Sequence, residues 1–465
     1  MQIKLVSVLI TSLLLSGCSL APKMSTPKSE LPASQKNIVI NVQWWKQFND
    51  ENLNKLIVET LKNNDDLKLA VANVQKARAQ YGISKADMYP QLNLNAAGSV
   101  QRKSVNAYLG RYGGIYKDFS LSASVAYELD FWAKAYNQKR ANLALLLATD
   151  ENKESLKISL ITDVSTYYFN LIAISKQLEI TKNTLKSYEE IYKYRQMQYT
   201  HGVIDKLVVA QVKAQVASAK SQLNIIKANE IKVKSTLVLL LGRTPKEIFK
   251  NILTTSTKFP ESIKIPVGLP ANILQNRPDV QAAQEILKSK TALIGVAKAA
   301  YFPAISLTGN LGYQSQMLSN LLGTGSQIWG VAPTISFPLF DFGRIAAAVK
   351  ITKADQKAAL ISYDKVVKIA YTEVYEALET IKISKEQQDS VKEEVAAYND
   401  AYEIAKKKFN MGTVSSLDVL NAQNSLLSAK LSYVKIQAQL LSNEATLYKV
   451  FGGGWKQTSD NNDTQ

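Results

Sequence analysis

The sequence predicts an α+β membrane protein in which long α-helical hairpins and short β-hairpins alternate, and in which this arrangement occurs twice. Three observations in the chain of 465 residues support the prediction. Two uninterrupted helical patterns have nearly the same length, four short segments alternate in polarity, and the same motifs recur in both halves. The fold class follows from their order, because each pair of alternating segments directly precedes one long helical pattern.

The clearest helical pattern is a long stretch without glycine or proline in the second half. It runs for 68 residues from Arg344 to Met411, is interrupted at Gly412, and resumes for 39 residues up to Phe451. Apolar side chains recur at alternating steps of three and four in both arms, which is the pattern of a coiled coil. At 1.5 Å per residue, the longer arm would be a rod of roughly 100 Å. We therefore predict a helical hairpin over residues 344–451.

The first half of the chain contains a pattern of almost the same length. Residues 133–241 hold an arm of 69 residues without glycine or proline, a break at Gly202, and a return arm of 39 residues. We interpret this agreement as an internal duplication, with structural repeats over residues 44–268 and 269–451. Corresponding positions are Tyr199 and Phe409, Leu207 and Leu417, Ala219 and Ala429, and Asp130 and Asp341.

Four segments between the helical patterns have a period of 2 instead of 3.6. They predict two β-hairpins, over residues 91–130 and 304–340, each with one apolar face and one face of small polar residues. This alternation is typical of the wall of a membrane β-barrel, although a strand of a soluble sandwich alternates in the same way. Four strands cannot close a barrel, and an open edge is not viable in lipid. Three chains would supply 3 × 4 = 12 strands, so the pattern favours a homotrimer around one twelve-stranded barrel.

The N-terminus resembles that of a bacterial lipoprotein. Residues 1–17 have the charge and the short apolar stretch of a secretory signal, and they end at Cys18 in the sequence Leu-Ser-Gly-Cys. In lipoproteins that cysteine is acylated and becomes the mature N-terminus; the alternative is a plain signal peptide with an incidental cysteine. Ser19 takes the place of the aspartate that retains lipoproteins in the inner membrane, so the resemblance implies outer-membrane lipid as a partner. We expect residues 18–43 to be a tether and residues 452–465 a disordered tail.

Composition argues against several other classes of protein. The net charge is +17, but the lysines are spread along helix faces among glutamates, so we expect a solvated surface and no nucleic-acid partner. The single cysteine excludes an internal disulfide and a cysteine-rich metal site, and the single histidine, His201, excludes a multi-histidine zinc site. The sequence also contains no glycine loop that binds phosphate. We therefore predict neither an enzyme nor a cofactor, and we expect His201 to be a surface residue.

Four motifs, in the right order, resemble those of the TolC-like outer-membrane efflux proteins, specifically the lipoprotein factors that serve resistance-nodulation-division pumps. The resemblance covers nearly the whole chain after Cys18. The motifs are Trp44-Trp45, Leu274-x-x-Arg277-Pro278-Asp279, Ala300-Tyr301-Phe302-Pro303-Ala304 with Ser306-Leu307-Thr308-Gly309, and Gly412-x-x-Ser415-x-Leu417-Asp418-Val419-Leu420.

The resemblance implies a trimer with a β-barrel in the outer membrane of a Gram-negative cell and a long α-helical barrel that crosses the periplasm. It implies an exit duct for drugs or other toxic small molecules, without chemistry at this protein. An inner-membrane pump of the resistance-nodulation-division class would supply the energy, and a periplasmic adaptor would join the two. Gly202 and Gly412, with Val203 and Thr413, would then form the periplasmic tips where the adaptor docks.

The resemblance also implies a constricted entrance beside these tips. Asp418 matches an aspartate of the acidic ring that lines the entrance in relatives, whereas Asn421 stands where some carry a second aspartate. The tyrosine and arginine that latch the entrance in some members are replaced by Phe409 and Val414. A hydrophobic constriction by Phe409 or Leu417 is the hypothesis in their place. The alternative for Asp418 is a solvated acid in the first turn of a helix.

Two other functions stay open at this point. The exit duct of a type I protein secretion system shares the expected fold, and a periplasmic coiled-coil adaptor or tether would share the helical hairpins. The acylation motif and Arg277-Pro278-Asp279 favour the drug-pump branch, and a tether leaves the four alternating segments unexplained.

Overall fold

The computed structural model describes residues 19–22, 38–39, 43–104, 114–244, 246–247, 258–263, 276–453 and 456–457. The predicted signal peptide of residues 1–17, the acylation site Cys18 and most of the predicted tether and tail lie outside the described residues. Within that tether and tail, β1 (Ile38–Val39) pairs antiparallel with β6 (Lys456–Gln457), a pairing that the sequence did not predict.

The chain divides into two compact units. Both combine segments from the two halves of the sequence, and the divisions fall within α3 (Asp65–Ala86), α4 (Lys134–Thr200), α7 (Pro278–Ala299) and α8 (Arg344–Asn410). We call them the sheet unit, which comprises residues 1–28, 73–150 and 282–364, and the hairpin unit, which comprises residues 29–72, 151–281 and 365–465.

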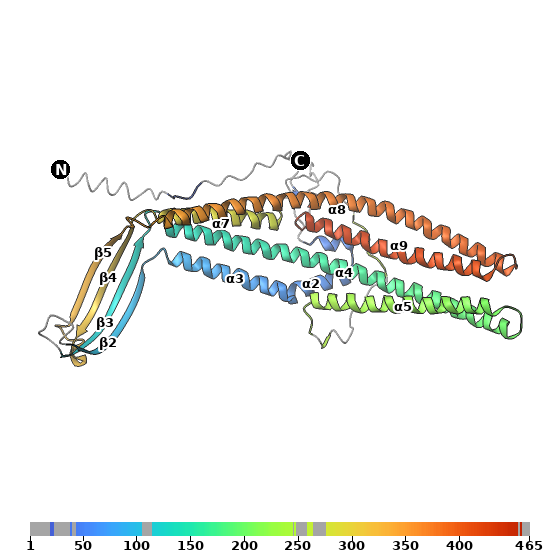
Figure 1. Ribbon diagram of the computed structural model, residues 1–465, viewed down its shortest axis with the longest axis horizontal. Helices are drawn as coiled ribbons and strands as arrows, with labels where there is room; N and C mark the ends of the chain where they lie inside the picture. The colour runs from blue at the N-terminus through green and yellow to red at the C-terminus, as the bar shows by residue number, and fades with distance from the viewer. Residues whose placement is uncertain are drawn as a thin grey trace, which may run out of the picture. The chain divides into compact units, whose positions relative to one another are not determined.

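The sheet unit contains one antiparallel sheet of four strands in the order β2-β3-β4-β5 (Figure 1). The two predicted β-hairpins are confirmed, and β3 joins them by pairing with β4. The sequence did not predict this pairing between the repeats, because alternation within a strand does not specify its neighbour. The strands are β2 (Gln91–Lys103), β3 (Gly114–Leu129), β4 (Ala304–Ser315) and β5 (Gln327–Ser336).

One face of this sheet is apolar and exposed. Directly paired residues point to the same face, so the register arranges apolar side chains in rows across the strands. Leu94 and Trp329 at the two ends of one row are 76% and 78% exposed. An apolar face of this extent is unusual on a soluble monomer. Two successive rows are Leu92, Val125, Gly309 and Val331, and Leu94, Ala123, Leu311 and Trp329.

Matching aspartates start the two longest helices. Asp130 accepts two backbone hydrogen bonds around the start of α4, and Asp341 accepts two around the start of α8, at 2.7 to 3.0 Å. These bonds satisfy N–H groups that have no partner within the helix. The predicted correspondence of the two aspartates therefore has a physical reason.

Among the described residues, no helix is both long and apolar enough to cross a bilayer.

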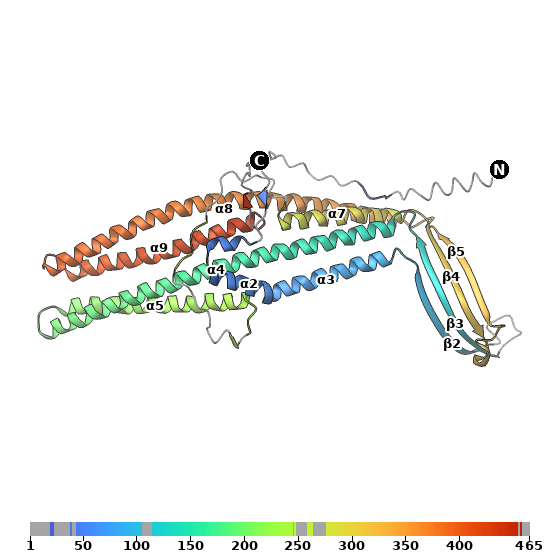
Figure 2. The same cartoon turned by 180° about the vertical axis from the view of Figure 1, so that it is seen from behind.

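The hairpin unit contains two helical hairpins, whose arms lie side by side in both views (Figures 1 and 2). In the first hairpin, α4 is followed by the antiparallel helix α5 (Lys206–Leu240). In the second hairpin, α8 is followed by α9 (Ser416–Val450). The turns need glycine, because φ is 73° at Gly202 and 74° at Gly412, a region that other residues rarely adopt. Backbone hydrogen bonds of 2.8 to 3.0 Å close both turns in the Schellman pattern. The predicted hairpins and their tips are confirmed.

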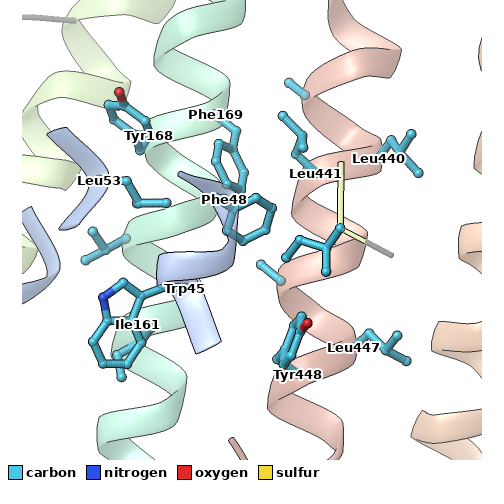
Figure 3. Packing of buried hydrophobic residues seen from close by; sticks show 14 of the residues in the cluster. Trp45, Phe48, Leu53, Ile161, Tyr168, Phe169, Leu440, Leu441, Leu447 and Tyr448 are labelled. Carbon is cyan, nitrogen blue, oxygen red and sulfur yellow. The ribbon is translucent and has the colours of Figure 1, made fainter. Parts of the chain in front are cut away.

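The core of the hairpin unit joins the 3₁₀ helix η1 (Trp44–Phe48) to α4 and α9 (Figure 3). Trp44 stacks on Tyr448 with ring centroids 4.7 Å apart, and Phe48 meets the edge of Phe169 at 5.0 Å. Trp44 and Phe48 are completely buried. Because these contacts link the first residues of one repeat with the last helix of the other, they hold the duplicated halves together.

Arg277 joins three helices of the same unit. Its guanidinium donates to Asp279 at 2.7 and 3.0 Å, to Glu373 of α8 at 2.6 Å and to the carbonyl of Val450 at 3.0 Å. The side chain is buried, and Gly452 packs against its backbone in a positive-φ conformation. A planar group with several fixed donors suits such a junction, and lysine could not replace it. The Arg277-Pro278-Asp279 motif is therefore a structural clamp.

Candidate functional site

Asp418 caps the start of α9. The backbone N–H and the hydroxyl of Ser415 donate to its carboxylate at 2.8 and 2.7 Å, and its own N–H donates to the Ser415 hydroxyl at 3.2 Å. The Ser415 hydroxyl and then the backbone N–H lower the pKa of Asp418. The carboxylate is exposed and stays charged at neutral pH. Asp418 therefore is an acid in the first turn of a helix, which was the alternative that the sequence left open. Its charge is nevertheless exposed at the surface of the chain.

The first repeat places its acid elsewhere. Asp205, the counterpart of Ser415, caps α5 and accepts the N–H of Leu207 at 2.7 Å. Sequence reasoning missed Asp205, although an aspartate just before an apolar helical run is a recognised start signal. Both second arms therefore begin with a carboxylate close to the tip glycine.

Phe409 lies under a buried arginine. The guanidinium carbon of Arg195 in α4 is 4.6 Å from the centre of the Phe409 ring in α8. Arg195 is only 7% exposed, and it donates to Gln198 at 2.6 Å. Burial lowers its pKa. Phe409 thus joins the two hairpins by a cation–π contact within one chain, so its ring is not a freely projecting apolar group.

A polar bridge also connects the hairpins along α4, α5 and α9. The Tyr188 hydroxyl donates to the side-chain oxygen of Asn424 at 2.6 Å. The side-chain amide nitrogen of Asn424 donates to the side-chain oxygen of Gln215 at 2.8 Å. Gln423 adds a bond to Ser187 at 3.0 Å. Tyr188 is 1% exposed, and burial raises its pKa to about 12, so the hydroxyl stays a donor at physiological pH. We call Tyr188, Asn424 and Gln215 the inter-hairpin bridge.

An apolar cluster supports the bridge. Leu420, one turn before Asn424, is 2% exposed and packs with Tyr188, Val212 and Val216. Sequence reasoning missed the bridge and this cluster as functional candidates, because the partners are separated by more than 200 residues. No signal in the sequence singled them out.

The other predicted residues are at the surface of the chain. Leu417 is 39% exposed and Val203 is 66% exposed. His201 is exposed, as expected. The structure therefore brings Asp418 and the tips together at one end of the hairpins, and it keeps Leu417 uncovered. The remaining predicted site residues, all exposed, are Asn421, Gly202, Gly412 and Thr413.

The sequence pattern that defines the outer membrane efflux protein family matches residues 56–243 and 269–453, and these ranges contain both helical hairpins and both β-hairpins. The chain belongs to the outer membrane efflux protein family. It is 33% identical to the toluene efflux pump outer membrane protein TtgC of Pseudomonas putida, over 97% of this chain and 96% of that protein. It is 32% identical to the cation efflux system protein CusC of Escherichia coli, over 96% of this chain and 98% of that protein.

A solved structure agrees with this assignment. The Campylobacter jejuni CmeC outer membrane channel superimposes with a TM-score of 0.91 and 30% identity, over 95% of this chain and 96% of that one. The predicted fold class, family, efflux function and outer-membrane location are confirmed. The roles expected of Asp418, Asn421, Phe409, Leu417 and the tip residues stay predictions.

Proposed function

We propose that three copies of the chain form the exit duct of a tripartite efflux pump. The duct would pass toxic small molecules from the periplasm to the outside without altering them. A periplasmic adaptor would bind the hairpin tips around Gly202 and Gly412, and an inner-membrane pump of the resistance-nodulation-division class would supply the energy. Acyl chains on Cys18 would anchor each copy in the lipid of the outer membrane.

The observation that carries the proposal is the four-stranded sheet. Its order leaves one side of β2 and one side of β5 without a paired strand within the described chain. Unpaired backbone groups are costly in lipid, and only a closed set of strands avoids them. The exposed apolar rows supply a face for the acyl chains, and Asn95 and Ser124 bond to each other on the opposite face at 3.0 Å. Three such sheets give 3 × 4 = 12 strands.

The names of two relatives support the proposed substrate class, and the predicted entrance adds a preference for cations. TtgC carries the name of a toluene efflux pump, and CusC that of a cation efflux system. We propose that the duct of this chain likewise carries toxic small molecules. Three copies of the charged Asp418 near a common axis would attract cations and repel anions.

Two lysine substitutions on neighbouring residues of β5 test this function. Val331 lies on the apolar face and Ala332 on the opposite face. In a barrel wall, a charge facing lipid costs about 2–4 kcal/mol near the midplane, whereas the lumen tolerates it. Val331→Lys should therefore abolish outer-membrane insertion and complementation of a deletion strain, and Ala332→Lys should retain both. The readouts are detergent-extractable protein in the outer membrane and the accumulation of a fluorescent efflux dye.

The same strains separate this function from its rivals. A periplasmic tether would tolerate both lysines, because neither residue would meet lipid. A protein secretion duct would show the Val331→Lys defect, but the deletion strain would accumulate no extra dye and would lose a secreted protein instead. Either result would remove the efflux proposal.

A further inference from the structure

Residues 19–22 directly follow the predicted acylation site and are docked on the sheet unit. The Ser19 hydroxyl donates to the side-chain amide oxygen of Asn137 at 3.1 Å. The Lys298 ammonium donates to the backbone carbonyl of Leu20 at 3.3 Å. The contacts come from two helices that are far apart in the sequence, the first turn of α4 and the last turn of α7.

Gly295 leaves space for the segment between the two helices. We call the site formed by Asn137, Gly295 and Lys298 the cradle. A Cβ at residue 295 would lie 2.6 Å from the Asn137 amide nitrogen and 3.0 Å from the Cβ of Ala21. Any larger residue would displace Asn137 or Ala21. Asn137 is completely buried, and its amide nitrogen has no hydrogen-bond partner among the described residues.

We propose that Asn137, Gly295 and Lys298 form a docking site for the segment Ser19–Ala21, and that this site fixes where the acyl chains enter the membrane. Ser19 directly follows Cys18 in the chain, and consecutive Cα atoms are about 3.8 Å apart, so a docked Ser19 would limit how far the acylated residue can move. The cradle lies where the helices meet the sheet: α4 begins shortly after β3 ends, and α7 ends shortly before β4 begins. The acyl chains would therefore start at the level where the apolar face of the sheet begins. The inference rests on the proposed acylation of Cys18 and adds a binding site for the processed N-terminus.

A disulfide between the segment and the cradle tests the proposal. A Cβ at residue 295 would lie 3.0 Å from the Cβ of Ala21, so a small outward shift of the segment gives the separation of about 3.5–4.5 Å that a disulfide requires, and the native chain contains only one cysteine. The Ala21→Cys, Gly295→Cys double variant should cross-link in the oxidising periplasm. Gly82 is a matched control, because it is also helical, lies in the sheet unit and has nothing within 4 Å of an added Cβ. We expect at least fivefold more cross-linked peptide than in Ala21→Cys, Gly82→Cys, measured by non-reducing peptide mass mapping.

A second measurement avoids the crowded Gly295 position. Trypsin can cleave after Lys23, two residues beyond the docked segment. Ser19→Ala with Lys298→Gln should speed this cleavage about fivefold in purified membranes, whereas Lys353→Gln on the exposed part of α8 should leave it unchanged. Equal cross-linking in both double variants, or unchanged cleavage, would overturn the docking site. A channel that inserts and exports normally in the same strains would show that only the docking site, and not the proposed function, has failed.

Discussion

At the scale of single residues, Asp418 combines two roles that can be separated. Its carboxylate completes the helix cap with Ser415, and its charge is exposed near the tip. Loss of the cap alone costs about 1 kcal/mol of stability in typical helices. The pair therefore offers a variant that weakens the helix start without removing the charge.

Asp418→Asn should reduce the cation preference of the open channel at least twofold, because the ring of three charges is lost. Ser415→Ala should retain the preference, since the carboxylate remains. The measurement is the reversal potential in a planar bilayer under a potassium chloride gradient. Equal selectivity in Asp418→Asn and the native protein would remove Asp418 from the entrance.

Glu444 of α9 shows the opposite shift. It is 1% exposed and accepts hydrogen bonds from the Ser262 hydroxyl and, at 3.1 Å, from the Ile263 N–H. Burial raises its pKa, although the two hydrogen bonds and the charge of Lys385 oppose the shift. A carboxyl whose pKa is higher in the folded state contributes stability below its unfolded pKa, and this contribution is lost as the pH rises through the folded value.

Glu444→Gln should therefore be more stable than the native protein at pH 7, because it keeps hydrogen-bonding groups without a buried charge. The difference should shrink as the pH falls toward about 4, the usual pKa of a glutamate. Thermal unfolding of the detergent-purified protein at several pH values measures it. A native protein that unfolds at a higher temperature than Glu444→Gln at pH 7 would contradict the account.

At the scale of helices and strands, the hairpins could be predicted almost completely from the sequence. The stretches without glycine or proline predicted the lengths of the helical arms, and Gly202 and Gly412 predicted the positions of the turns. Both features depend on local sequence patterns. The contacts between hairpins could not be predicted. Tyr188 meets Asn424, and Arg195 meets Phe409, across more than 200 residues of chain. A local sequence pattern does not identify contact partners that are so far apart in the chain.

The inter-hairpin bridge should help to hold the hairpins in this arrangement. Asn424→Ala leaves the buried Tyr188 hydroxyl without its acceptor, at a cost of about 1–3 kcal/mol. If the tips form the entrance, the variant should open it more often and raise sensitivity to antibiotics too large for general porins several-fold. The measurement is the minimum inhibitory concentration in cells that produce equal amounts of channel.

Ser428→Ala is the matched control, because Ser428 is exposed on the same helix and lies one turn further from the tip, outside the predicted entrance. It should leave sensitivity unchanged. If both variants, or neither, increase sensitivity, the bridge does not determine closure.

At the scale of the whole molecule, the open edges of the sheet carry the central claim. Alternation predicted the strands, and the resemblance predicted their use, but the pairing of β3 with β4 appeared only in the structure. That pairing turns two separate hairpins into one sheet of four strands with edges at β2 and β5. A sheet with two open edges and an exposed apolar face requires further copies of the chain to close in lipid.

Native mass spectrometry of the detergent-purified protein tests this claim most directly. The account predicts one dominant species with the mass of three acylated chains, and its loss in Val331→Lys but not in Ala332→Lys. A native protein that is folded and monomeric under the same conditions would contradict the account, because four strands alone cannot close a channel.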